Sequence, residues 1–201
     1  MSDDTQQDAY RQQMARKKRL IEARVQKADR DQGVLLVNTG NGKGKSSAGF
    51  GVIARALGHD MQVGVVQFIK GAFSTGEETF FRRLPGVEYH VMGEGFTWET
   101  QDRDRDIAAA GSAWEVAARM LSDERYQVVL LDELNIVLNK ELLPLDEVLD
   151  ALRRRPIMQH VVVTGRHAPQ ALIELADTVT WMKMERHAFK AGIRAQRGME
   201  L

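Results

Sequence analysis

The chain has 201 residues, of which 43% are apolar, and its 28 basic and 28 acidic residues give a formal net charge of zero. This length suits one compact domain whose core is large enough to fold without a disulfide or a structural metal. The absence of cysteine excludes thiolate zinc sites, iron–sulfur clusters, disulfide scaffolds and cysteine nucleophiles.

Residues 1–32 form a polar leader that differs in composition from the rest of the chain. Between Arg11 and Arg30, eight Lys or Arg residues stand against two acids, and the few apolar residues indicate a weakly amphipathic helix. A solvated helix, a nucleic-acid arm and a lid over a partner's active site all fit this pattern. Because the net charge is zero, the whole molecule provides no general attraction for nucleic acid, which makes such a partner less favoured.

The first eight residues lack the apolar centre of a signal peptide, and the longest apolar runs are four or five residues. A bilayer span needs about 20 apolar residues. We therefore expect a soluble, cytoplasmic protein with no membrane partner.

From residue 33 to 201, apolar runs alternate with amphipathic segments and glycine-containing loops. The pattern predicts strands at 34–39, 62–69, 87–92, 127–131, 160–164 and 178–184, and helices at 46–57, 103–121, 145–154 and 169–176. It predicts an irregular segment between the second and third strands. Valine- and leucine-rich strands without polar alternation need helices on both faces, which predicts a doubly wound α/β domain with a mainly parallel sheet of about six strands. Ligands of such sheets bind at the carboxyl ends of the strands.

The first loop at that edge, residues 39–47, reads Thr-Gly-Asn-Gly-Lys-Gly-Lys-Ser-Ser between a strand and a helix, which is typical of a phosphate-binding P-loop. Its glycines allow backbone N–H groups to form one nest, the helix start adds positive charge, and Lys45 can neutralise phosphate oxygens. The expected phosphate-binding residues are Gly40, Asn41, Gly42, Lys43, Gly44, Lys45, Ser46 and Ser47.

The loop departs from the general pattern G-x-x-x-x-G-K-[ST], because Thr39 occupies the position of the first glycine. An ordinary glycine turn is the alternative interpretation, but such a turn has no need of Lys43 and Lys45 beside two serines. A Rossmann dinucleotide loop is weaker still, because its third glycine would fall at Lys45.

A second phosphate-site element ends the strand predicted at 127–131, where Asp132 and Glu133 follow directly. Carboxylates at this position typically hold a phosphate-bound magnesium ion, together with the P-loop hydroxyl of Ser46. The alternative is that Asp132 only caps the next helix. With both elements at one sheet edge, we expect a metal–nucleotide site with Ser46, Asp132 and Glu133 as metal ligands.

Six blocks of sequence together resemble the P-loop type of ATP:corrinoid adenosyltransferases. They are Gly40–Ser46 (GNGKGKS), Val65–Gly71 (VVQFIKG), Gly95–Thr100 (GFTWET), Leu131–Leu134 (LDEL), Val163–Arg166 (VTGR) and His187–Phe189 (HAF). The resemblance implies transfer of the 5′-deoxyadenosyl group of ATP to the Co(I) of a cobalamin or cobinamide, with release of triphosphate. It also implies a homodimer, a divalent metal (Mg²⁺ or Mn²⁺), a reduced flavoprotein as electron donor, and a role in adenosylcobalamin biosynthesis or salvage.

This chemistry needs no catalytic base, because cobalt itself attacks C5′. The protein must instead stabilise the departing triphosphate, a role we assign to Lys45 and Lys43 as the catalytic residues. The resemblance also implies that Phe96 and Trp98 cover one face of the corrin and displace its lower axial ligand, although aromatics at this place can simply pack in a core. Arg55 is a candidate for ribose or phosphate contacts, or a surface arginine.

Lys70, Arg166 and His167 follow predicted strands and are weaker candidates for ligand contacts. For the leader, the resemblance favours a lid over the partner's bound corrinoid. Two other functions stay open at this point. A small-molecule kinase or NTPase acting at the γ-phosphate shares the same phosphate elements, and a nucleotide-gated nucleic-acid module is suggested by the leader.

Overall fold

The computed structural model describes residues 3–69, 75–91 and 102–199, and the chain divides into two compact units, Met1–Gln32 and Gly33–Leu201. The first unit contains the helix α1 (Asp3–Val25). Its described side chains, from residue 6 on, are exposed except for Met14, which is partly buried. The helix therefore buries no apolar face within its own unit.

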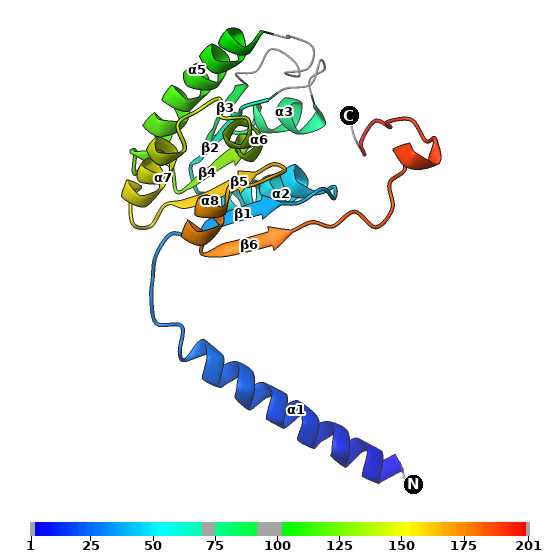
Figure 1. Cartoon of the computed structure of the whole chain (residues 1–201). Coiled ribbons are helices and arrows are strands. Elements are labelled where there is room, and N and C mark those ends of the chain that lie inside the picture. Colours follow the sequence, from blue (N-terminus) through cyan, green and yellow to red (C-terminus); the bar gives the residue numbers. More distant parts are fainter. Residues whose placement is uncertain (1–2, 70–74, 92–101, 200–201) are drawn as a thin grey trace. The chain divides into compact units, whose positions relative to one another are not determined.

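The second unit is built on a six-stranded, all-parallel sheet with the strand order β3-β2-β4-β5-β1-β6 (Figure 1). The strands are β1 (Leu35–Thr39), β2 (Val63–Gln67), β3 (Val87–Val91), β4 (Val128–Asp132), β5 (His160–Thr164) and β6 (Thr178–Trp181). This confirms the predicted α/β class and parallel sheet. Because β5 pairs with both β1 and β4, whatever follows β5 emerges between the loop after β1 and the acids after β4.

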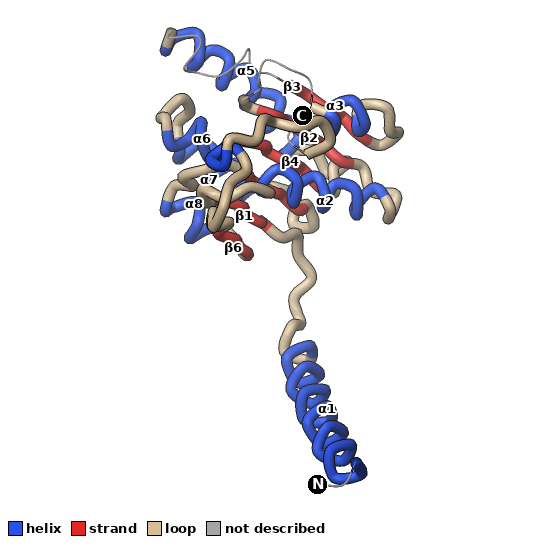
Figure 2. The backbone as a smooth tube through the Cα atoms, turned by 90° about the vertical axis from the view of Figure 1, so that its right-hand side faces the viewer, coloured by secondary structure: helices blue, strands red, loops and turns tan. Residues whose placement is uncertain are grey.

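Helices cover both faces of the sheet. One face packs against α2 (Lys45–Leu57) and α3 (Gly76–Phe81), and the other against α5 (Arg103–Leu121), α6 (Leu134–Asn139), α7 (Leu145–Arg154) and α8 (Gln170–Leu175). Figure 2 shows the strands between these two layers. Along β4, Val128 and Leu130 face the α2 side while Val129 and Leu131 face the other, so these four side chains are buried in the two cores.

Two short helices were not predicted. The segment expected to be irregular contains α3, whose N-cap Thr75 accepts a hydrogen bond from the backbone N–H of Glu78 at 3.3 Å. The second is α6, which follows β4 almost directly. Each has six residues, which is too short to show a helical apolar period.

The last strand, predicted to reach Met184, ends at Trp181. The next backbone groups contact the first loop instead of extending the sheet, and a single 3₁₀ turn, η1 (Phe189–Ala191), lies further along. Within the described ranges, every helix is too short or too polar to span a lipid bilayer.

Candidate functional site

The loop after β1 leads directly into α2, and Gly44 forms its turn. Gly44 adopts a φ of 105°, in the left-handed region that favours glycine, and α2 begins at the next residue. Within the described part of the chain, no side chain caps this helix start. The first N–H groups of α2 therefore lack intrahelical acceptors and offer a place for an anion.

The segment that follows β6 packs against this loop. The backbone N–H of Gly42 donates to the carbonyl of Met182 at 2.6 Å, and the N–H of Met184 donates to Oδ1 of Asn41 at 3.1 Å. A Cβ atom at Gly40 or Gly42 would lie 2.5 or 2.7 Å from the Met182 carbonyl oxygen. The backbone at Met182 therefore leaves no room for a side chain at either position. Glycine is required here for packing as well as for the binding of any phosphate.

Thr39, which stands where the general pattern has its first glycine, is completely buried at the end of β1. Its hydroxyl accepts a hydrogen bond from the backbone N–H of Ala168 at 3.1 Å, and its carbonyl accepts one from the N–H of Met182 at 2.8 Å. The departure from the pattern therefore has a structural reason, since Thr39 ties the loops after β5 and β6 to the first loop.

Lys45 is 7% exposed, and its Nζ donates to the carbonyl oxygen of Gly42 at 2.5 Å. Burial lowers the pKa of this ammonium group, whereas the carboxylate of Glu133 acts in the opposite direction. Ser46 is partly buried, and Lys43 is exposed. The loop thus presents a buried ammonium group, a hydroxyl and free helix N–H groups together.

Asp132 is a buried hydrogen-bond acceptor at the end of β4. Its Oδ1 accepts from the hydroxyl of Thr164 at 2.6 Å, and its Oδ2 accepts from Nε2 of Gln67 at 2.9 Å. It does not cap α6, because the residue before that helix is Glu133. The carboxylate of Asp132 therefore joins the ends of three neighbouring strands, β2, β4 and β5.

Glu133 carries an unsatisfied oxygen. Its backbone has a φ of 62° and donates to the Thr164 hydroxyl at 3.0 Å, while its buried Oε2 has no hydrogen-bond partner among the described residues. Burial and the neighbouring carboxylate of Asp132 raise the pKa of Glu133 to about 7, against the lowering effect of Lys45 and Arg166. A buried carboxylate oxygen without a donor suits a cation.

No cluster of three or more acidic or histidine side chains suitable for a metal lies in the part of the chain that the structure describes. A cation beside Glu133 would therefore need further oxygens, such as the Ser46 hydroxyl and a bound phosphate. This is the usual arrangement for magnesium at a phosphate site, where few ligands come from protein carboxylates.

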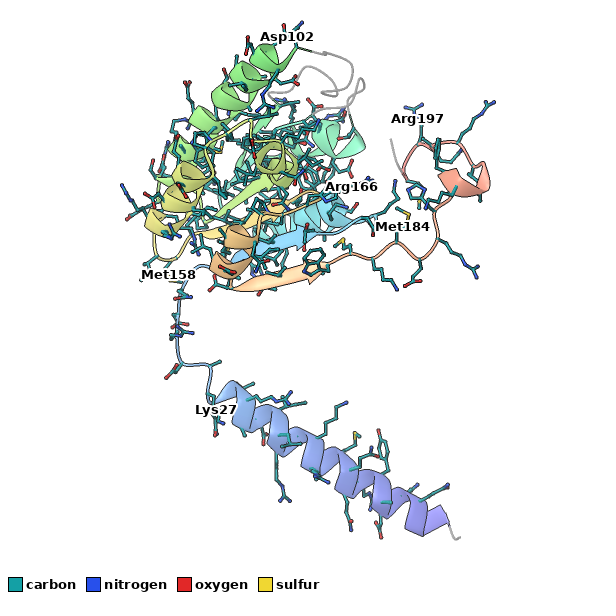
Figure 3. All side chains as sticks on the ribbon, viewed as in Figure 1. Lys27, Asp102, Met158, Arg166, Met184 and Arg197 are labelled. Atoms are coloured by element: carbon teal, nitrogen blue, oxygen red, sulfur yellow. The ribbon has the colours of Figure 1, made fainter. Side chains whose placement is uncertain are left out.

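The structure does not bring Arg55 to the loop. It is exposed in the last turn of α2, nine residues beyond Ser46, which corresponds to a rise of about 14 Å along the helix. Phe96, Trp98 and Lys70 lie outside the described residues. Arg166 and His167 are exposed immediately after β5, and Figure 3 labels Arg166 on the side of the sheet where the strands end.

Several buried polar residues at this edge were not predicted as part of the site. Gln67 and Thr164 hold Asp132, and Asn135, which is fully buried, donates from Nδ2 to the carbonyls of Asn38 at 3.3 Å and Gly165 at 3.0 Å. Three of these residues, Asn38, Gln67 and Thr164, stand at or next to the end of an apolar strand. This position in the sequence could have identified them, because a polar residue at the end of an apolar strand lies at the edge of the sheet where ligands bind.

Comparison with known proteins gives concordant results. A family model described as "ATP:corrinoid adenosyltransferase BtuR/CobO/CobP" matches residues 31–201. A corrinoid adenosyltransferase of Pseudomonas aeruginosa is 62% identical over 192 residues, covering 95% of each chain. One from Escherichia coli K12 is 47% identical over 193 residues, and the corrinoid adenosyltransferase CobA of Salmonella typhimurium is 46% identical over 193 residues; each alignment covers 96% of this chain and 98% of the relative.

Proposed function

The chain belongs to the ATP:corrinoid adenosyltransferase family, and from that membership we propose how the residues at the carboxyl edge of the sheet carry out the reaction. The protein is an enzyme that uses ATP to adenosylate a corrinoid. In this transfer the Co(I) centre supplies an electron pair to C5′ of ATP, a cobalt–carbon bond forms, and the C5′–O bond breaks. The oxygen keeps the bonding pair and leaves as part of triphosphate.

We propose that the residues of the first loop bind the triphosphate and stabilise it as it leaves. The observation that carries this assignment is the position of Lys45, whose ammonium group lies on the Gly42 carbonyl beside the open start of α2. Charge grows on the leaving oxygen, so fixed N–H groups and the ammonium groups of Lys45 and Lys43 lower the barrier electrostatically. A catalytic base is unnecessary, because the attacking atom carries no proton.

A divalent cation, Mg²⁺ or Mn²⁺, suits the oxygen ligands that Ser46 and Glu133 offer. We propose that the Ser46 hydroxyl and the unsatisfied Oε2 of Glu133 hold it, together with phosphate oxygens. The cation supplies positive charge to the triphosphate. Both oxygens of Asp132 already accept hydrogen bonds, so we propose that Asp132 supports the structure of the site and is not itself a metal ligand.

The remaining assignments stay predictions. Phe96 and Trp98 are expected to contact the corrin, and the leader of one subunit of a homodimer to cover the corrinoid of the other and exclude water. A reduced flavoprotein is the expected electron donor, and the cytoplasm the expected location. Family membership does not favour the alternative of a kinase or NTPase acting at the γ-phosphate.

Analysis of the products tests this function directly. The enzyme is incubated with MgATP and chemically reduced cobalamin, and the products are followed by phosphorus NMR and by the absorbance of the corrinoid. We expect inorganic triphosphate and a light-sensitive cobalt–carbon product in equal amounts. Formation of ADP without adenosylated corrinoid would refute the proposal.

Two variants separate the proposed roles. Lys45→Ala should weaken ATP binding, because it removes the buried ammonium group of the loop. Trp98→Ala should leave ATP affinity unchanged and slow the reaction of the corrinoid. Equal losses of ATP affinity in the two variants would contradict this division.

A further inference from the structure

Arg166 is an exposed cation at the centre of the candidate site. It lies two residues beyond the end of β5, and β5 stands between β1 and β4 in the sheet. The chain after β5 therefore emerges between the phosphate loop and the two acids. Figure 3 labels Arg166 at this edge, on the same side of the sheet as Met184, whose backbone contacts the loop.

The backbone that carries Arg166 is closely held. The preceding Gly165 has a φ of +124°, and a Cβ atom there would lie 3.1 Å from Oε2 of Glu133 and 3.0 Å from Cβ of Asn135. The side-chain amide of Asn135 also donates to the Gly165 carbonyl and to the Asn38 carbonyl. These contacts connect the peptide before Arg166 to the end of β1 and to the proposed metal ligand.

The electrostatics leave the guanidinium available for an anionic ligand. Arg166 makes no hydrogen bond or ion pair with any residue in the described ranges, although its charge lowers the pKa of both Lys45 and Glu133. Arg166 thus lies close enough to Lys45 and Glu133 to act on both, and its exposed guanidinium can pair with an anion at the phosphate loop.

We propose that Arg166 is a catalytic residue that contacts the triphosphate part of ATP and stabilises it while the C5′–O bond breaks. The inference deepens the proposed function and rests on it. As cobalt donates its electron pair to C5′, the bonding pair stays on the phosphate oxygen, which gains one negative charge. A planar guanidinium can pair with two phosphate oxygens at once, which a lysine cannot do.

Binding of inorganic triphosphate is the most direct test, because this probe contains neither adenosine nor corrinoid. Its affinity in the presence of Mg²⁺ is measured by calorimetry for the wild type, Arg166→Ala and Arg166→Lys. Arg154→Ala is the matched control, because it removes an exposed arginine paired with Asp150 on α7, in a helix that precedes β5 and so ends at the opposite edge of the sheet. The single-turnover rate of adenosylation is measured for the same four proteins.

We expect Arg166→Ala to bind triphosphate at least about 10-fold more weakly and to adenosylate about 10²-fold more slowly, with an unchanged KM for the corrinoid. Arg166→Lys should recover only part of both losses, because it restores the charge without the two-pronged geometry. Arg154→Ala should behave as the wild type. Urea midpoints equal to that of the wild type would show that the losses do not come from unfolding.

Two results would overturn the inference while leaving the proposed function intact. In both, the wild type still releases triphosphate. Either Arg166→Ala matches the wild type in triphosphate affinity and rate, or its only defect is a raised KM for the corrinoid, which would place Arg166 on that substrate. Release of ADP by the wild type would instead contradict the proposed function itself.

Discussion

The hydroxyl oxygen of Thr164 lies 2.6 Å from Oδ1 of Asp132, and this buried contact joins the ends of β5 and β4. The same hydroxyl accepts the backbone N–H of Glu133 at 3.0 Å. One side chain thus holds the carboxylate of the first acid and the backbone of the second. Because Glu133 has a φ of 62°, a conformation uncommon for a residue with a side chain, this support maintains the direction of the proposed metal ligand.

Replacing Thr164 with valine keeps the shape of the side chain and removes its hydroxyl. The buried carboxylate of Asp132 then loses a donor, and the N–H of Glu133 loses its acceptor. We expect Thr164→Val to lower the free energy of unfolding by about 1–3 kcal/mol. Urea denaturation of the two proteins measures this difference.

Thr164→Ser is the control for that experiment, because it keeps the hydroxyl and removes only a methyl group. Its stability and adenosylation rate should lie much closer to those of the wild type than to those of Thr164→Val. If the serine variant were as unstable as the valine variant, the methyl group's packing, and not the hydrogen bonds, would explain the loss.

Gly42→Ala should damage the phosphate loop through a backbone collision. The new Cβ would lie 2.7 Å from the carbonyl oxygen of Met182 and 2.8 Å from its carbonyl carbon, and neither atom belongs to a flexible side chain. We expect a loss of about 1–3 kcal/mol in unfolding free energy and at least a 10-fold loss of ATP affinity, measured by denaturation and calorimetry.

Gly51→Ala provides the matched control for the loop substitution. Gly51 lies on the exposed face of α2, where an added Cβ meets no atom of the described chain within 4 Å. Alanine there should stabilise the helix by up to about 1 kcal/mol and leave ATP affinity unchanged. If Gly42→Ala bound ATP with normal affinity, the backbone at Met182 could move away from the loop without harm to ATP binding, which would contradict this prediction.

The parts of the fold that depend on long apolar patterns could be predicted from the sequence. Two of the four predicted helices, at residues 103–121 and 145–154, have the predicted bounds, and valine-rich runs form the inner strands. The helices α3 and α6 could not be predicted in this way, because each is shorter than two helical turns. Only the capping residue Thr75 signals the first of them.

The candidate site could be predicted in part for a similar reason. Lys45 and Glu133 belong to patterns with a known phosphate chemistry, and both lie at the expected edge. The packing of Met182 on Gly42, and the links from Asn135 to the ends of β1 and β5, join residues far apart in the sequence. No local sequence pattern predicts such contacts, because they depend on the order of the strands in the sheet.

Glu133→Gln should raise the metal concentration that the reaction requires. The substitution removes the negative charge of the carboxylate whose Oε2 has no partner among the described residues. We expect the Mg²⁺ concentration for half-maximal adenosylation to rise about 10-fold or more. Asp132→Asn should change this concentration less and the urea midpoint more, since Asp132 already accepts hydrogen bonds from Thr164 and Gln67. Equal metal requirements in both variants would contradict the division between ligand and support.

A separate ionic cluster joins the edge strand β3 to α5, away from the proposed site. The carboxylate of Glu88 accepts hydrogen bonds from Arg119 at 2.5 Å and from the hydroxyl of Tyr126, and it contacts Nε2 of His90 at 2.8 Å. Burial alone would raise the pKa of Glu88, but the hydrogen bonds from Tyr126, Arg119 and His90 outweigh it and lower this pKa to about 2.

Because its folded-state pKa is below the ordinary value near 4.5, Glu88 stabilises the fold at neutral pH and loses this effect as the pH falls from about 4.5 toward 2. We expect Glu88→Gln to lower the free energy of unfolding by about 0.5–1 kcal/mol at pH 7, a modest value because the group is partly exposed. Urea denaturation at decreasing pH, down to the lowest at which both proteins fold, should show the difference shrinking. Glu115→Gln, an exposed substitution on α5, should show little difference at any pH. A gap between wild type and Glu88→Gln that stayed constant below pH 4.5 would mean that shape, and not charge, explains it.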